Sequence, residues 1–432
     1  MINKFLLLLL CFLITDLTAQ KPSPQMAQLE EEVKEWRHHF HQYPELSNRE
    51  FNTAKYISEQ LKKMDIEHET GVAHTGVIGY IKGGKAGPTV ALRADIDGLP
   101  VKERVDLAWA SKETTEYLGE KVGVMHACGH DTHTAMLLGA AKLLKADQAN
   151  LQGNIVLIFQ PAEEGAPPGE EGGAKLMVKE GVLEKYKVDV VFGQHISSGL
   201  DVGKITYKVG GTMAAADRFV IKVKGKQAHG SRPWSGVDPI TISAQIIMGL
   251  QTIVSRQTEL TKEAAVITVG KISGGVRNNI IPEEVEMVGT IRTLDVEMQD
   301  IIHEKIRKTA TLIAEAGGAE AEVEIDIGYP VTYNDPELTR KMIQTLFDTA
   351  GEDNVHVVAA RTGAEDFSFF AQKVPGLYWF LGGRPTSVNQ ENTTGHHTPD
   401  FFVDDASLML GVKTLRQVAL DYMSADQGDM GR

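Results

Sequence analysis

The sequence contains very little cysteine: its 432 residues include two, Cys11 and Cys128. Cys11 lies in the N-terminal stretch MINKFLLLLLCFLITDLTAQ, whose basic start, short apolar centre and small residues near its end are typical of a secretory signal peptide. An uncleaved anchor is the alternative, but the apolar centre is only about half as long as a membrane-spanning helix. Removal of residues 1–20 leaves Cys128 without an intramolecular partner, which excludes a disulfide framework. We therefore expect an exported protein, periplasmic or extracellular, with one thiol.

Beyond this stretch the sequence lacks any apolar run long enough to cross a bilayer, and it has no excess of basic residues. The 44 Lys and Arg against 58 Asp and Glu give a net charge of -14, spread without long acidic blocks. Such a balance disfavours nucleic acid and anionic membranes as partners. Internal repeats and low-complexity segments are also missing. The remaining chain of about 410 residues is too long for one ordinary domain, so we expect two.

The first and last parts of the chain alternate helices with continuous apolar strands. This pattern predicts a largely parallel sheet covered by helices on both faces. Asp131 is the expected N-cap of its helix. The predicted strands span 76–83, 89–95, 154–160, 188–193 and 376–383, and the predicted helices 26–43, 50–64, 131–145, 172–181, 336–350 and 405–424.

The middle of the chain has a different pattern, with half-exposed alternating strands and two helices in the order strand-helix-strand-strand-helix-strand. This order is that of a ferredoxin-like α+β domain. The sequence therefore predicts an α/β domain formed by residues 21–212 and 328–432, with residues 213–327 inserted into it as a second domain. The predicted strands of the insertion span 219–226, 264–275, 283–294 and 321–327, and its helices 239–256 and 297–316.

Chemically capable side chains come just after several predicted strands of the larger domain. The carboxyl ends of parallel strands form the ligand crevice of an open sheet, and polar groups avoid the ends of buried strands unless they are paired. Residues far apart in sequence are therefore expected to converge on one site. They are Asp95, Asp97, Glu163, Glu164, His195, His396 and His397.

The segment HACGHD carries the sharpest signal. Cys128 and His130 are two residues apart where a helix begins, so both side chains can turn to one point, and the helix start is expected to lower the pKa of the thiol. Thiolate, imidazole and carboxylate together suit Zn²⁺ or Mn²⁺. A nucleophilic cysteine and a structural core cysteine remain alternatives.

The pair Glu163 and Glu164 in QPAEEG would add a further metal ligand and a group that moves a proton, which hydrolysis needs. Neighbouring side chains in an extended loop point apart, so one carboxylate can bind a metal while the other holds a water molecule and moves its proton. A solvated acidic turn is the alternative, and the position directly after a buried strand argues against it.

Ten motifs occur in the order seen in the M20 metallopeptidase family, and they resemble its amidohydrolase branch, which includes hippurate hydrolases, N-acyl-L-amino-acid amidohydrolases and auxin-conjugate hydrolases. They cover nearly all of the chain after the signal peptide. The motifs are RHHFHQYPELSNREFNTA, LRADIDGLPV, MHACGHDTHTAMLLGAA, FQPAEEG, FGQH, QAHGSRPWSGVDPI, RNNIIPE, GTIRT, GAEDFSFF and GHHTPDF.

This resemblance implies a catalytic domain with an inserted lid and two divalent metal ions, Mn²⁺ or Zn²⁺, between them. Cys128 would bridge the ions, and Glu163 would be the general base and acid. The choice of Glu163 over Glu164 as base, and of His397 over His396 as ligand, comes from the resemblance alone. The implied ligands are Cys128, His130, Glu164, His195 and His397.

The resemblance also implies that the lid contributes to the site. His229 would polarise the scissile carbonyl, in many members across a dimer interface, so a homodimer formed through the lid is expected. Asn279 and Arg292 match positions near the substrate carboxylate or acyl oxygen. In the catalytic domain, Asp95 would orient a ligand histidine without binding metal.

Other histidines and acids receive simpler interpretations. The sequence predicts packing or capping for the histidines of the first helix and a supporting position beside the ligands for His126 and His133. Glu365 and Asp366 fall in a family motif without a derived role. The first-helix histidines are His38, His39 and His41.

The resulting hypothesis is an exported hydrolase that cleaves the amide bond of N-acyl amino acids, such as N-acetyl or N-benzoyl conjugates, to a carboxylate and a free amino acid. The expected partner is this small substrate or a dipeptide-like one, and neither nucleic acid nor membrane. The alternatives are a metallo-dipeptidase or carboxypeptidase of the same fold, a non-catalytic binding protein, and a cysteine hydrolase.

Overall fold

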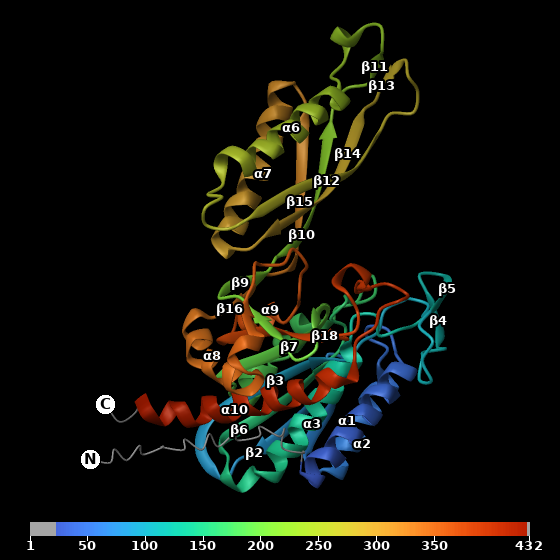
Figure 1. The fold of residues 1–432 in the computed structure, drawn as a ribbon. Helices are drawn as coiled ribbons and strands as arrows, with labels where there is room; N and C mark the ends of the chain where they lie inside the picture. The colour runs from blue at the N-terminus through green and yellow to red at the C-terminus, as the bar shows by residue number, and fades with distance from the viewer. Residues whose placement is uncertain (1–22, 430–432) are drawn as a thin grey trace, which may run out of the picture.

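A computed structural model describes residues 23–429. The predicted signal peptide lies outside these residues. Two separate sheets dominate the fold, a large one in the lower body and a smaller one in a domain that stands above it (Figure 1). Within the described part of the chain, no helix combines the length and apolar character that crossing a membrane requires.

The large sheet has eight strands in the order β1-β2-β6-β3-β7-β18-β8-β17. Its centre is parallel, because β3 pairs in parallel with β6 and β7, and β7 with β18. The outer pairs β1-β2, β2-β6 and β18-β8 are antiparallel. The strands are β1 (Glu67–Val72), β2 (Gly76–Lys82), β3 (Lys85–Asp95), β6 (Gln152–Gln160), β7 (Val190–Asp201), β8 (Ile205–Tyr207), β17 (Val355–Val357) and β18 (Gly376–Arg384).

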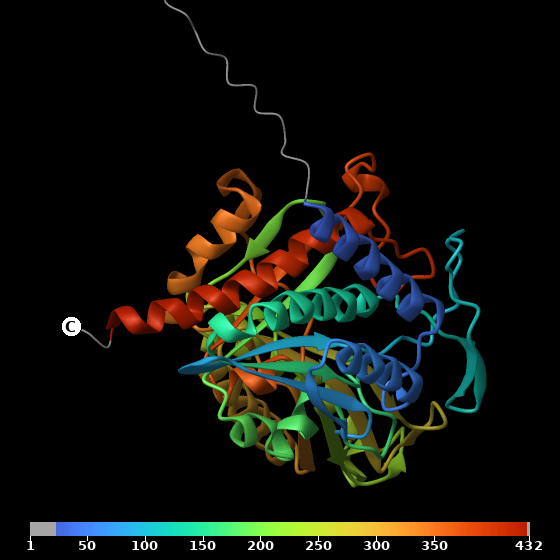
Figure 2. The same ribbon diagram turned by 90° about the horizontal axis from the view of Figure 1, so that it is seen from below.

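Helices cover both faces of this sheet, as the continuous apolar strands require. One face packs on the first helices, on α3 and on the last helix, and Figure 2 shows the blue α1, the teal α3 and the red α10 together on that side. Shorter helices cover the opposite face. The predicted α/β class is confirmed. The first group is α1 (Pro24–Gln42), α2 (Phe51–Lys63), α3 (His130–Ala146), α8 (Pro336–Ala350) and α10 (Leu408–Asp429), and the second α4 (Gly173–Lys179), α5 (Val182–Tyr186) and α9 (Ser368–Ala371).

The smaller domain is a four-stranded antiparallel sheet in the order β12-β14-β10-β15 with two helices packed on one face. This order and the alternating burial of the strands are those of the predicted ferredoxin-like pattern. We call this domain the lid. Its elements are β10 (Ala216–Lys224), α6 (Pro239–Gln257), β12 (Ala265–Gly274), β14 (Glu284–Thr293), α7 (Val296–Ala316) and β15 (Glu320–Tyr329).

Two short strands join the lid to the body. β9 (Gly210–Met213) pairs antiparallel with β16 (Thr332–Asn334), so the outgoing and returning chain lie side by side. The chain enters the lid after β9 and leaves it before β16 (Figure 1). The predicted limits of the insertion, 213–327, stay a prediction.

Two local predictions were wrong. His195 does not follow its strand, because β7 continues to Asp201 and pairs with β18 along this length. Asp131 is not the N-cap of α3. That position is taken by Gly129 with a positive φ of 98°, where an added Cβ would lie 2.3 Å from Cγ2 of Ile196. Only glycine tolerates both the conformation and the close approach.

Candidate metal centre

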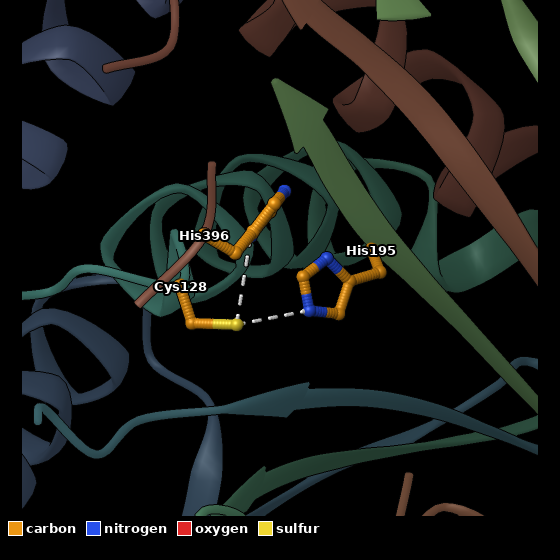
Figure 3. Close-up of side chains that lie close together, drawn as sticks. All are labelled: Cys128, His195 and His396. Carbon is orange, nitrogen blue, oxygen red and sulfur yellow. Dashed lines mark hydrogen bonds between the residues drawn. The ribbon is translucent and has the colours of Figure 1, made fainter. Parts of the chain in front are cut away.

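The residues that the sequence selects in the larger domain meet at one edge of its sheet. Cys128 lies in the loop before α3, and His130 is the first residue of that helix. The two glutamates follow β6, His195 lies within β7, and the histidine pair follows β18. Figure 3 shows Cys128, His195 and His396 facing one another from three separate segments.

Cys128 is the centre of this arrangement. Its Sγ lies 3.4 Å from Nε2 of His195 and 3.7 Å from Nδ1 of His396 (Figure 3). Cys128, Glu164 and His397 form a second group whose potential ligand atoms all lie within 4.8 Å of one another. In this group Nε2 of His397 lies 3.0 Å from Oε1 of Glu164. Cys128 therefore belongs to two groups of donor atoms.

His130 is held by one ring nitrogen and leaves the other free. Nδ1 lies 2.9 Å from the backbone oxygen of Asp97 and 3.2 Å from its carboxylate, so it carries the proton and donates. Nε2 is buried and has no hydrogen-bond partner among the described residues. It lies 3.7 Å from Oε2 of Glu163. A histidine fixed through one nitrogen in this way presents the lone pair of the other to a cation.

His195 and His133 differ in the hydrogen bonds of their ring nitrogens. Nδ1 of His195 lies 2.5 Å from the backbone oxygen of Ile196 and donates to it, which leaves Nε2 directed at Cys128. His133 uses both nitrogens: Nδ1 lies 2.6 Å from Asp95, and Nε2 accepts from the Ile196 N–H at 2.8 Å. Asp95 thus bonds His133, whereas it lies 3.8 Å from Nδ1 of His130.

Burial is the main cause of three pKa shifts in the site. It raises the pKa of the Cys128 thiol well above its usual range, and the carboxylates of Glu164 and Glu163 add to the rise. The expectation that the helix start lowers this pKa was wrong, because burial and the two carboxylates outweigh the dipole. Burial also raises the pKa of Glu163, with help from Glu365 and Glu164, and lowers the pKa of His195 well below normal.

The three lid residues lie elsewhere. His229 is exposed in β11 (Ala228–His229), which pairs with β13 (Ile280–Ile281) at the far tip of the lid, and its Nδ1 accepts from the N–H of Ser231 at 3.1 Å. Asn279 precedes β13, and its carbonyl accepts from the Gly230 N–H. Arg292 lies on β14 opposite Val266. Within one chain, none of the three lines the cavity around Cys128.

Comparison with known proteins decides the family. A family model described as peptidase family M20/M25/M40 matches residues 91–421. The chain belongs to this family. The resemblance seen in the sequence is thereby confirmed.

Two relatives and one solved structure illustrate the similarity to this M20 chain. Thermostable carboxypeptidase 1 of Saccharolobus solfataricus is 42% identical over 90% of this chain and 96% of its own. N-acetyl-L-cysteine deacetylase of Bacillus subtilis is 38% identical over 89% of this chain and 86% of its own. The Bacillus subtilis YxeP protein, described as a dinuclear metal-binding peptidase of the M20 family, aligns with a TM-score of 0.76 and 34% identity over 92% of this chain and 99% of that one. The protein is a hydrolase of amide bonds.

The donor set of this M20 enzyme fits divalent metal ions. It combines a thiol, imidazoles and carboxylates, the ligands that borderline ions such as Zn²⁺ accept. The orphaned Nε2 of His130 is a buried polar atom that an ion would satisfy. Three donor groups overlap around the cavity: Cys128 with His195 and His396; Cys128 with Glu164 and His397; and His130 with Glu163 and Glu164.

A buried charge network supports this edge of the sheet. The Arg93 guanidinium lies 2.8 Å from both Asp95 and Glu365 and 2.9 Å from Asp366. Glu365 accepts from the Tyr378 hydroxyl at 2.6 Å, and Asp366 accepts from the side chain of Gln160 at 2.8 Å. Glu365 and Asp366, to which the sequence assigned no role, thus fix Arg93, which in turn holds Asp95.

The sequence placed Asp97 near the site without a role, and it missed two further residues. Asp97 bonds His130 and also accepts from the Glu164 N–H at 3.0 Å. Tyr329 donates its hydroxyl to the backbone oxygen of Glu163 at 2.6 Å. Arg361 lines the cavity although no motif marks it.

Two cavities meet at Glu164. The first, of about 340 Å³, is bounded by Met213, Tyr329 and Arg361 and by donor residues other than His130, namely Cys128, Glu163, Glu164, His195, His396 and His397. The second, of about 550 Å³, lies beside it under the hairpin of β4 (Thr114–Tyr117) and β5 (Glu120–Gly123). The donor groups therefore lie in a space that is large enough for a small substrate.

Proposed function

We propose that this protein is an exported, binuclear metal-dependent amidohydrolase that cleaves N-acyl amino acids to a carboxylate and a free amino acid. The observation that carries this proposal is the overlap of three donor groups around one cavity, with Cys128 and Glu164 each shared by two of them. Shared donors between adjacent groups suit a pair of ions better than a single one.

In this proposal, Cys128 would be a ligand of both of two divalent ions, Mn²⁺ or Zn²⁺. The ions would polarise the scissile carbonyl and lower the pKa of a water molecule. The remaining ligands are His130, Glu164, His195 and His397.

The hydrogen bonds of His396 support His397 as the ligand. Nε2 of His396 faces the Ser198 N–H at 3.3 Å and accepts from it, so the proton of the ring resides on Nδ1. That proton points at Cys128 Sγ, 3.7 Å away. His396 is therefore suited to donate to the sulfur, whereas His397 has a nitrogen beside Glu164.

Glu163 is the proposed general base and acid. Its carboxylate lies in the cavity beside Glu164, and burial together with Glu365 raises its pKa, so it holds a proton more readily than an exposed glutamate does. It would take a proton from the attacking water and return it to the leaving amine. The Tyr329 hydroxyl fixes the backbone of Glu163 during this transfer.

The lid would complete the site in a homodimer. His229 is exposed and far from the cavity of its own chain, so its proposed role on the carbonyl requires the lid of a partner chain or a large movement of its own lid. Asn279, close to His229 in the β11-β13 pair, would act with it.

The relatives favour two substrate classes. The deacetylase, 38% identical, favours N-acyl amino acids. The carboxypeptidase, 42% identical, favours a second candidate function, cleavage of a C-terminal peptide bond. Both classes place a free carboxylate next to the scissile amide.

Metal analysis combined with a substrate panel tests the proposal. Protein purified without chelators should contain about two divalent ions per chain, and it should hydrolyse N-acetyl and N-benzoyl amino acids faster than dipeptides. Faster turnover of dipeptides would support the second candidate. Less than about one ion per chain with no turnover of any panel member would indicate a binding protein. N-terminal sequencing of the secreted or periplasmic fraction tests export, with removal of residues 1–20 as the expected result.

A further inference from the structure

Arg361 has an unusual position for an arginine. It lies in the segment between β17 and α9, and its backbone is fixed to the strand that leads to the lid: its N–H donates to the Thr212 carbonyl and its carbonyl accepts from the Ala214 N–H, both at 3.0 Å. The backbone of this segment is thus fixed, and the side chain of Arg361 lines the cavity with the donor groups.

The guanidinium of Arg361 has no acidic partner. Its central carbon lies 3.5 Å from the centroid of the Phe380 ring, and it makes no hydrogen bond or ion pair with any side chain among residues 23–424. Burial lowers its pKa. Other arginines of the body that are withdrawn from solvent are paired: Arg37 with Asp131, Arg93 with Asp95 and Arg384 with Asp201.

An unpaired cation withdrawn from water destabilises a protein unless something compensates for it. The Phe380 ring provides part of this compensation through a cation–π contact. The five N–H donors of the guanidinium remain free for a planar, bidentate partner, and a carboxylate has this geometry.

We propose that Arg361 binds the carboxylate of the substrate and so selects N-acyl amino acids with a free acid group. This inference rests on the proposed function, which supplies the substrate class. Arg361 is the one arginine or lysine among the described residues that line this cavity, so it offers a carboxylate a cationic partner apart from the donor groups. Because Arg361 packs on Phe380, which pairs in register with His195, the amide next to that carboxylate then lies beside the donor groups.

Paired substrates test the proposal. N-acetyl-L-methionine and its carboxamide, N-acetyl-L-methioninamide, differ only in the negative charge. For Arg361→Gln, kcat/KM for the acid should fall about 10- to 100-fold, because a charge-assisted hydrogen bond is lost. The kcat/KM for the amide should change less than about threefold. Arg361→Lys should restore part of the loss for the acid. Arg340→Gln, on the exposed side of α8, is the matched control and should leave both substrates unchanged.

Three results would overturn the assignment. Equal losses for acid and amide would show that Arg361 only supports the 358–366 segment. An unchanged kcat/KM for the acid would show that Arg361 has no role in binding the substrate. A selective loss for the acid in Arg292→Gln but not in Arg361→Gln would place the carboxylate at the lid.

A binding measurement separates this inference from the proposed function. Calorimetric titration of both methionine compounds into the metal-loaded Glu163→Gln protein, with and without Arg361→Gln, needs no turnover. Preference for the acid that disappears with Arg361→Gln supports the inference even if the wild-type protein hydrolyses no panel member. Equal binding of acid and amide to both proteins contradicts the inference even if N-acyl amino acids are hydrolysed.

Discussion

The carboxyl edge of the large sheet carries buried histidines, whereas the tip of the lid carries the exposed His229, and the two differ in their hydrogen bonds. At the sheet edge, His130 and His195 are buried, and each donates one nitrogen to a backbone carbonyl while the other is left for the cavity. At the lid tip, His229 is exposed and accepts a hydrogen bond from its own turn. The buried histidines are organised within one chain, whereas His229 does not line the cavity of its own chain.

The largest expected loss of activity follows from replacing Glu163, the proposed proton carrier at the edge of the large sheet. Glu163→Gln keeps the size of the side chain but cannot move a proton, so kcat should fall about 1,000- to 10,000-fold with metal content unchanged. Steady-state kinetics and metal analysis check this. The matched variant Glu164→Gln should lose metal as well as activity. Near-normal turnover of Glu163→Gln would contradict the role of Glu163.

A somewhat smaller effect is expected at the lid. His229→Ala should lower kcat about 100- to 1,000-fold, because a donor to the developing oxyanion is lost, without a change in metal content. If the partner chain supplies His229, mixing the inactive His229→Ala and Glu163→Gln proteins should restore up to about a quarter of the wild-type activity, since half of the dimers are mixed and each has one intact site. Mixtures that stay inactive after subunit exchange would place His229 in its own chain's site.

The thiol at the centre of the sheet edge gives the next comparison. Cys128→Ser removes a donor that can become anionic, and activity should fall about 100-fold together with the loss of metal. Cys128→Asp supplies another anionic donor and should retain both ions and most of the activity. Metal analysis and kinetics on the two variants decide the matter. Full metal content with complete loss of activity in Cys128→Asp would revive the nucleophile hypothesis.

The smallest effect concerns the support of His130. Asp97→Asn weakens the hold on Nδ1 of His130 and on the Glu164 N–H, so metal affinity should fall about 10- to 100-fold. Competition with a chelator measures this. Asp95→Asn is the comparison, because Asp95 bonds His133, and it should weaken metal binding less. The reverse order would show that Asp95 is the main support.

The fold was largely predictable because buried parallel strands leave a clear mark. The apolar runs at 89–95 and 154–160 correspond to β3 and β6, and the alternating lid strands show the half-exposed pattern that a two-layer domain imposes. The strands β1, β8 and β17 were missed, since β1 is mostly polar and the other two have three residues each. Strands that are this polar or this short are specified by their neighbours and not by their own sequence.

The site was predictable to the extent that chain position determines it. Residues after parallel strands converge, so the neighbourhood of Cys128, Glu164 and His397 could be foreseen. The state of each group could not. The high pKa of the Cys128 thiol depends on burial by distant segments, and the isolation of Arg361 depends on which acids the fold keeps away from it. The residues next to Cys128 and Arg361 in the sequence carry no signal for these properties.

The order of the sheets along the chain has a consequence for assembly. All four strands of the lid lie in one continuous stretch, from Ala216 to Tyr329, so the ribosome delivers everything that this sheet and its core require before β18 is made. The large sheet still lacks an interior strand at that time, because β18 lies between β7 and β8. The sequence separation of 268 between Cys128 and His396 imposes the same delay on the donor groups. The inserted domain can therefore be complete first, and ion capture becomes one of the last steps in making the enzyme.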